Sequence, residues 1–357
     1  MTTLQSPLFT AIRAVTASLT NVSSSGCVLV ACSGGADSLA LAGAVAAMSQ
    51  RGDQRRFGAI VIDHQLQADS ASVAAIAKQQ CIELGLDPVE VLEVDVAIGP
   101  GSGGLEAAAR DARRAALRQA AERHLAQAVL LGHTLDDQAE TVLLGLARGS
   151  GARSLSGMSD HDELWRRPFL RVSRATVRAA CSEAGLAPHE DPHNVDSAFA
   201  RVRVRETALP MLESELGPGV ANALARTAEL LRNDADALDE WARSEYDSRV
   251  EVSGETVFVS LIPEGDDSAT FAQLPTAIRT RVERLALQHV GCPIGAATFH
   301  HLSAVDALVD NWRGQGATRA PGDVEVSRES GKLCFRPAGA LLLDPSTRSP
   351  QLLSKDH

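Results

Sequence analysis

The chain has 357 residues, 45% of them hydrophobic, and a formal net charge of −11, so it is long enough for two domains with separate cores and too acidic for indiscriminate nucleic-acid binding. No apolar stretch approaches the roughly 18 residues of a membrane helix, and the N-terminus lacks an export signal, so no membrane contact is expected. The six cysteines lie far apart without a Cys-x-x-Cys pair, which predicts reduced thiols in the cytoplasm and argues against a zinc or iron–sulfur site.

Short apolar runs alternate with longer helical patterns after a first amphipathic helix within residues 1–25. Strands that alternate with helices of this length predict a parallel, doubly wound α/β sheet, in which ligands bind beyond the carboxyl ends of the strands. The expected strands are 28–32, 57–62, 88–94, 128–131 and 164–166, and the expected helices are 39–48, 70–85, 104–126, 135–147 and 173–184.

A glycine turn joins the first strand to the next helix. Such a turn directs free backbone N–H groups and the helix dipole at one point, which favours an anion. Gly34 and Gly35 allow a close approach that a Cβ would block, and Asp37 offers a carboxylate for Mg²⁺; an ordinary capped turn is the alternative. The nucleotide phosphate site predicted here consists of Ser33, Gly34, Gly35, Ala36, Asp37 and Ser38.

Two further polar groups stand where the second strand ends. Asp63 and His64 follow its last apolar residue. A carboxylate and an imidazole at this edge can contact a nucleotide, or they can simply cap the turn.

Charged residues share one face of the helix expected at 104–126. Glu106, Arg110 and Arg113 are spaced at i, i+4 and i+7. A salt-bridged stripe exposed to solvent is the usual meaning of this spacing, and it is the preferred interpretation of these residues by themselves.

Three carboxylates gather where the fourth strand gives way to a helix. After His133, the pair Thr134 and Asp137 forms a capping box, which is a structural explanation for Asp137. Asp136 and Glu140 lie within one turn of it, however, and like charges at this spacing repel one another unless a cation lies among them. The pattern predicts a site for a metal ion or an amine.

Arginines concentrate between residues 165 and 205, a segment that contains eight arginines and four acidic residues. A basic segment in an acidic chain suits a polyanion partner, with a solvated surface as the alternative. Arg201, Arg203 and Arg205 alternate with valine, which indicates a strand edge or an extended arm.

The composition changes after residue 215. A long amphipathic helix at 216–245 is followed by mixed strand and helix patterns, which predict a second, smaller α+β domain. The expected division is a first domain at 1–215, a second domain at 216–340 and a tail at 341–357.

Taken in order, these motifs resemble those of the tRNA(Ile)-lysidine synthetases, a family of the PP-loop ATP-pyrophosphatase superfamily. The loop Ser33–Ser38 is shared across the superfamily, whereas the string His133–Thr141 and the charged helix narrow the resemblance to this family. The resemblance covers residues 27–212 strongly and 216–340 weakly, and it implies a catalytic domain at 1–215 and a tRNA-recognition domain at 216–340.

The resemblance implies a ligase that uses ATP, Mg²⁺ and L-lysine on the wobble cytidine of a tRNA(Ile) with a CAU anticodon. The C2 oxygen attacks the α-phosphorus and releases pyrophosphate, and the lysine ε-amine then displaces AMP at C2. The implied catalytic residues are Asp37, Arg113, Asp137 and Glu140, with Asp37 as metal ligand. The implied lysine site is Glu106, Arg110, Asp136, Asp137 and Glu140. Asp63, His64 and His133 join the loop at the nucleotide, and Arg167, Arg201 and Arg205 contact tRNA. A homodimer is a further expectation.

The chain departs from the family's usual residues at Arg114, His193, Phe199 and Val202, which concern RNA contacts. We expect a short form without the additional C-terminal domain of longer members. Two alternatives stay open: another adenylating tRNA-modification enzyme, although a thiolase would need cysteines that the spacing does not supply, and a non-catalytic nucleotide sensor.

Overall fold

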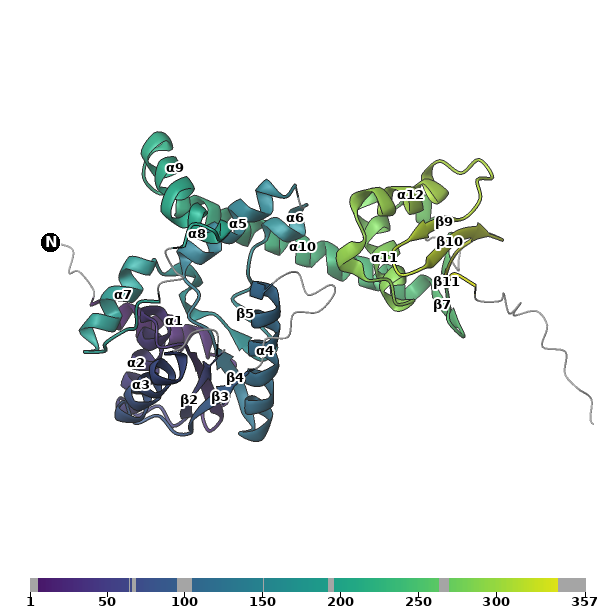
Figure 1. Ribbon diagram of the computed structural model, residues 1–357. Helices are drawn as coiled ribbons and strands as arrows, with labels where there is room; N and C mark the ends of the chain where they lie inside the picture. Colours follow the sequence, from purple (N-terminus) through teal and green to yellow (C-terminus); the bar gives the residue numbers. More distant parts are fainter. Residues whose placement is uncertain are drawn as a thin grey trace, which may run out of the picture. The chain divides into compact units, whose positions relative to one another are not determined.

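A computed structural model describes residues 6–63, 65, 69–94, 105–149, 151–191, 196–262 and 270–339. Its internal contacts divide the chain into two units, Met1–Arg232 and Asn233–His357, which are described separately (Figure 1). Within the described ranges, no helix combines the length and the apolar character that crossing a membrane requires.

A six-stranded sheet forms the centre of the first unit, in the order β3-β2-β1-β4-β6-β5. Neighbouring strands from β3 to β6 pair in parallel, and β5 runs antiparallel at the edge. The predicted doubly wound α/β fold is confirmed, with β5 as an edge strand that the sequence pattern does not predict. The strands are β1 (Cys27–Cys32), β2 (Arg56–Asp63), β3 (Val89–Glu93), β4 (Ala126–Leu130), β5 (His161–Asp162) and β6 (Trp165–Arg166).

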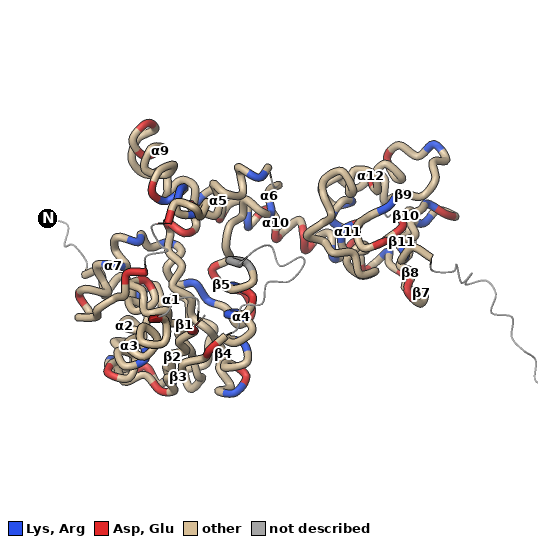
Figure 2. Tube along the Cα trace, in the orientation of Figure 1, with Lys and Arg blue, Asp and Glu red and all other residues tan. Residues whose placement is uncertain are grey.

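Helices cover both faces of this sheet, because successive side chains of a strand point to opposite sides. Val28 and Val30 pack with one group of helices, whereas Leu29 and Ile60 pack with Leu117 on the other face. The first group comprises α1 (Pro7–Ser18), α2 (Ala36–Gln50), α3 (Ser70–Glu83) and α7 (Arg174–Glu183), and Leu117 belongs to α4 (Leu105–Arg123). Figure 2 shows basic positions along α4 and on the chain beside it.

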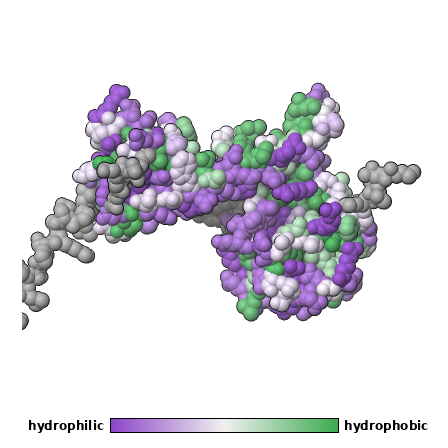
Figure 3. All heavy atoms as spheres, turned by 180° about the vertical axis from the view of Figure 1, so that it is seen from behind, coloured by the Kyte–Doolittle hydropathy of each residue, from purple (hydrophilic) through white to green (hydrophobic). Residues whose placement is uncertain are grey.

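The remaining helices of the first unit follow β4 and β6. Leu135 and Ala139 of α5 form a small core with Leu209 and Ala221. Apolar surface is exposed on α9, where Met211 is 58% and Leu216 72% exposed (Figure 3). These helices are α5 (Leu135–Ala147), α6 (Ala152–Leu155), η1 (Pro168–Arg171), α8 (Ala200–Arg203), η3 (Val204–Ala208), α9 (Leu209–Leu216) and α10 (Val220–Arg249).

The second unit contains a five-stranded antiparallel sheet in the order β7-β8-β11-β10-β9. Its core is formed by this sheet with the last part of α10 and two further helices. The division between the units falls within α10, whereas the change of composition lies just before that helix. The elements are β7 (Val250–Ser253), β8 (Thr256–Ser260), η4 (Phe271–Gln273), α11 (Thr276–His289), η5 (Ile294–Ala296), α12 (Phe299–Asp310), β9 (Thr318–Ala320), β10 (Val324–Glu329) and β11 (Lys332–Pro337).

Candidate active site

The loop after β1 is closed by its own hydrogen bonds. Gly34 has a φ of +78°, and a Cβ there would lie 3.2 Å from Cβ of Ala77 in α3, so both its backbone and its neighbour favour glycine. The Ser38 hydroxyl donates to the Gly35 carbonyl at 3.0 Å and accepts the Ser33 N–H at 3.1 Å. The loop therefore leads into the first turn of α2, whose amides have no intrahelical acceptor.

The end of β4 lies against this loop. A Cβ at Gly132 would be 3.0 Å from the carbonyl oxygen of Asp37, so the close approach requires glycine. The predicted capping box is confirmed, since Thr134 accepts the Asp137 N–H and donates its own N–H to the Asp137 carboxylate. This packing brings the acidic start of α5 next to Asp37.

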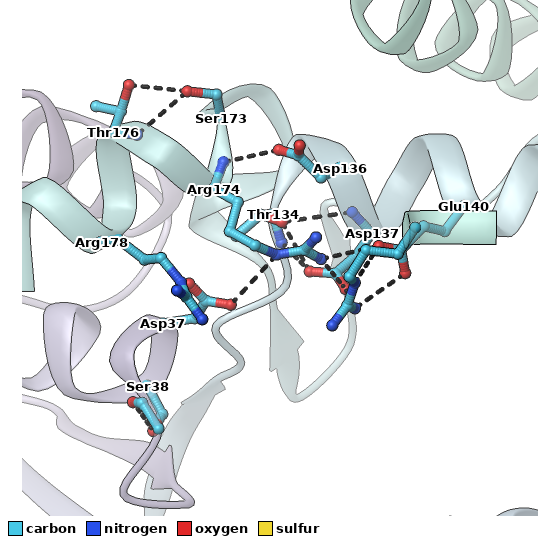
Figure 4. A network of polar contacts seen from close by, with 12 residues as sticks. Asp37, Ser38, Thr134, Asp136, Asp137, Glu140, Ser173, Arg174, Thr176 and Arg178 are labelled. Atoms are coloured by element: carbon cyan, nitrogen blue, oxygen red, sulfur yellow. Dashed lines mark hydrogen bonds and ion pairs between the residues drawn. The ribbon is translucent and has the colours of Figure 1, made fainter. Parts of the chain in front are cut away.

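Arg174 lies between Asp37 and the acidic start of α5 (Figure 4). Its Nη2 donates to Oδ1 of Asp137 at 2.9 Å and to Oε1 of Glu140 at 3.0 Å, while its Nε is 3.9 Å from Oδ2 of Asp37. Its backbone N–H donates to Asp136 at 2.7 Å. The cation expected among these carboxylates is therefore supplied, in this structure, by the protein.

Two more arginines contact the same carboxylates. Arg205 donates Nε and Nη2 to the two oxygens of Glu140 at 2.8 and 3.1 Å, and Nε of Arg201 is 3.2 Å from Oε2 of Glu140. Glu140 has no exposed surface, so its charge requires such partners.

The prediction that Arg201 to Arg205 form a strand edge or extended arm is wrong. These residues lie in α8 and in the π-helical turn η3. Positions four residues apart share a helix face, which brings Arg201 and Arg205 together at Glu140 while Val202 is buried. Their role in tRNA contact stays a prediction.

Burial and neighbouring charges shift the pKa values of this site. Burial and the charge of Asp137 raise the pKa of Asp37 to about 6, against the effect of Arg174. Burial would also raise the pKa of Asp137, but Arg174 and the Thr134 N–H outweigh it and lower that pKa. Asp137 is therefore already ionised in the pH range in which Asp37 titrates.

His133 is neutral in this environment. Burial lowers its pKa to about 3, with Arg113 and Arg167 acting in the same direction and Asp137 in the opposite one. Its Nδ1 is buried and, among the residues that the structure describes, has no hydrogen-bond partner.

Asp37 fits the role of a Mg²⁺ ligand. Its Oδ1 is buried and lacks a hydrogen-bond partner within the described part of the chain, so an oxygen is available for a hard cation. The described residues contain no group of three His, Cys, Asp or Glu side chains arranged for a metal.

The other predicted residues are placed as follows. The side chain of Glu106 and the whole of His64 lie outside the described residues. Asp63 is 5% exposed and accepts the Gln65 N–H at 2.8 Å, so it caps its turn, and a contact to nucleotide stays a prediction. Arg110 and Arg113 lie on α4 as expected, and Arg167 directly follows β6.

Sequence reasoning missed Arg174 and Arg178. Both lie on α7, four residues apart, and both oppose the rise in the pKa of Asp37. The available signal was Ser173, which caps α7 and fixes where this basic helix face begins.

Comparisons with known proteins agree with this site. Residues 8–212 match a family model for PP-loop domains, and residues 267–334 match a model for the TilS substrate binding domain. The chain is 51% identical over 312 residues to the tRNA(Ile)-lysidine synthase of Streptomyces coelicolor, covering 87% of this chain and 85% of that one. It is 50% identical over 320 residues to the tRNA(Ile)-lysidine synthase of Thermobifida fusca, covering 90% and 94%.

A solved structure shows the same fold at lower identity. The U34-tRNA thiolase NcsA from Methanococcus maripaludis has a TM-score of 0.51 and 20% identity, covering 63% of this chain and 80% of that chain. The two family models and the sequence identity to the two synthases identify the family as well as the fold. The chain belongs to the tRNA(Ile)-lysidine synthase family.

Proposed function

We propose that this chain attaches L-lysine to C2 of the wobble cytidine in a tRNA(Ile) with a CAU anticodon, in two steps at one site. The C2 oxygen attacks the α-phosphorus of ATP and pyrophosphate leaves; the lysine ε-amine then attacks C2, loses a proton, and AMP leaves. The observation that carries the proposal is the position of Arg174 between Asp37 and the pair Asp137 and Glu140.

The first step uses the loop after β1. Free amides at the start of α2 bind the departing pyrophosphate, and the rigid turn at Gly34 keeps them aimed at it. Asp37 would hold Mg²⁺, which when bound neutralises charge on the phosphates. Neutral His133 adds a polar nitrogen beside the same edge without adding charge.

The second step uses the acidic start of α5. Asp137, with its lowered pKa, is ionised and attracts the lysine ammonium, and Glu140 supplies a second charge. The ammonium enters by displacing part of the Arg174 or Arg205 contact, and one of these carboxylates takes its proton. Arg110 or Arg113 binds the lysine carboxylate.

The tRNA must present its target base unstacked from the anticodon loop. Only 3% of the residues are aromatic, so guanidinium groups such as Arg167 take the place of aromatic stacking. For Arg201 and Arg205 the contacts to Glu140 support a positioning role alongside any tRNA contact.

An ATP–pyrophosphate exchange assay with and without tRNA tests this proposal. Exchange that requires CAU-anticodon tRNA, followed by lysine-dependent release of AMP, is the expected result. Exchange without RNA would favour another adenylating enzyme, and nucleotide binding without exchange would favour a sensor.

We further propose that the protein acts as a homodimer in the cytoplasm. The exposed apolar side chains of Met211 and Leu216 on α9 support a contact between two copies. Sedimentation of the full chain, compared with a Leu216→Glu variant, tests whether two copies bury this surface.

A further inference from the structure

Three arginines at the carboxyl edge of the first sheet form a guanidinium cluster, consisting of Arg113, Arg114 and Arg167. Cζ of Arg114 lies 5.4 Å from the ring centre of Trp165, a distance that permits a cation–π contact. Trp165 is 4% exposed and packs with Leu117 of α4. The exposed Arg114 side chain is therefore held in place by a buried ring.

Arg167 directly follows β6, two residues after Trp165. The charge of Arg114 acts on the guanidinium of Arg167. Its side chain is 6% exposed and donates Nη1 to the Ser159 carbonyl at 2.7 Å. Its Nε is buried without a hydrogen-bond acceptor among the described residues.

In this cluster, no carboxylate of the described residues lies within ion-pair distance of Arg113 or Arg114. This distinguishes them from Arg174, Arg201 and Arg205, which neutralise Glu140. Burial lowers the pKa of Arg113, and the charges of Arg110 and Arg114 lower it further. Burial and Arg114 also lower the pKa of Arg167, against the effect of Asp162 and Asp160. The cluster concentrates positive charge that an anion would neutralise.

The position of the cluster indicates which anion it binds. β4 separates β6 from β1, so at about 4.8 Å per strand the end of β6, where Trp165 and Arg167 lie, is roughly 10 Å from the end of β1 and its loop. In an in-line displacement the nucleophile approaches opposite the leaving group. An RNA nucleophile therefore approaches from a side away from the loop, where its own phosphates need partners.

We propose that Arg114, held on the face of Trp165, binds a backbone phosphate of the tRNA next to the target cytidine. This inference rests on the proposed function, because it names part of the surface that holds the RNA. Guanidinium groups suit the task because they present paired donors to phosphate oxygens.

The test compares the full chain with Arg114→Ala, Arg114→Lys and Arg123→Ala. Arg123 lies at the far end of α4 and pairs with Glu90 on the surface, so its loss removes the same charge elsewhere. Binding of a fluorescein-labelled tRNA(Ile) transcript with a CAU anticodon is measured by anisotropy at several salt concentrations. Binding of a non-hydrolysable ATP analogue is measured alongside.

Arg114→Ala should weaken RNA binding about tenfold and reduce the salt slope by about one. Arg114→Lys should restore the slope but only part of the affinity, and Arg123→Ala should resemble the wild type. An unchanged slope in Arg114→Ala, an equal loss in Arg123→Ala, or weaker binding of the ATP analogue alone would each overturn the inference. If the wild type makes lysidine while Arg114→Ala binds RNA normally, the inference fails and the proposed function stands; a wild type that makes none overturns the proposed function itself.

Discussion

Glu140, which has no exposed surface, accepts two hydrogen bonds from the Arg205 guanidinium, at 2.8 and 3.1 Å. A two-point contact of this kind fixes both side chains. Breaking such a buried pair from one side leaves the other charge without its partner, which costs about 3–5 kcal/mol.

Glu140→Gln is therefore expected to lower the free energy of unfolding by about 3 kcal/mol and to raise the KM for lysine at least about tenfold, because both the network and the proposed amine site lose a charge. Pyrophosphate release should persist. Chemical denaturation and lysine titration measure the two effects, with exposed Glu122→Gln as control. An unchanged lysine KM in a folded variant would remove Glu140 from the amine site.

Asp37→Asn is expected to reduce pyrophosphate release at least about 100-fold, since an amide of the same shape cannot neutralise a cation at the phosphates. Binding of tRNA should be unchanged. Single-turnover release of pyrophosphate measures the effect, and Asp69→Asn, at the exposed residue that precedes α3, is the matched control. Activity within about tenfold of the wild type would contradict the assignment of Asp37.

The pH dependence of ATP use should report the titration of Asp37. Its pKa is raised to about 6, so below this pH the group is protonated and cannot hold Mg²⁺; kcat/KM for ATP should rise with pH through about 6. Arg178 lowers this pKa, so Arg178→Gln should move the midpoint to higher pH. Arg171 is exposed, and Arg171→Gln should leave the midpoint unchanged. A midpoint that is the same in both variants as in the wild type would exclude Asp37 as the titrating group.

Glu283 in the second unit should make stability depend on pH. It has no exposed surface, and burial with the nearby charge of Asp306 raises its pKa well above 4.5, against the effect of Arg279. Because the folded state holds the proton more tightly, stability falls as the pH rises above about 4.5. Glu283→Gln cannot ionise, so its advantage in urea denaturation should grow with pH, whereas exposed Glu255→Gln should show no such trend. A constant difference would contradict a protonated Glu283.

The strand ends were predictable because their signals are local. An apolar run, the turn at Gly34 and the Thr134 capping box each depend on neighbours in the chain, and the structure has them as expected. Gly35 is less constrained: its φ is −77°, and a Cβ would meet only Ser33 Oγ at 3.6 Å.

The arginines were harder to predict because their partners are remote in sequence. Arg201 lies 60 residues from Thr141, to which it donates a hydrogen bond, and alternation with valine over five residues does not distinguish a strand from a helix. The sequence shows that the segment is basic. Only the fold separates Arg174, Arg201 and Arg205, which neutralise Glu140, from Arg114, which lies on the face of Trp165.

Transfer of labelled L-lysine to a tRNA(Ile) transcript with a CAU anticodon tests the central claim most directly. The full chain with ATP and Mg²⁺ should incorporate label only into this RNA, with release of one AMP and one pyrophosphate per lysine, and a transcript with a different wobble base should remain unlabelled. A chain that binds both ATP and the CAU transcript yet incorporates no lysine would contradict it.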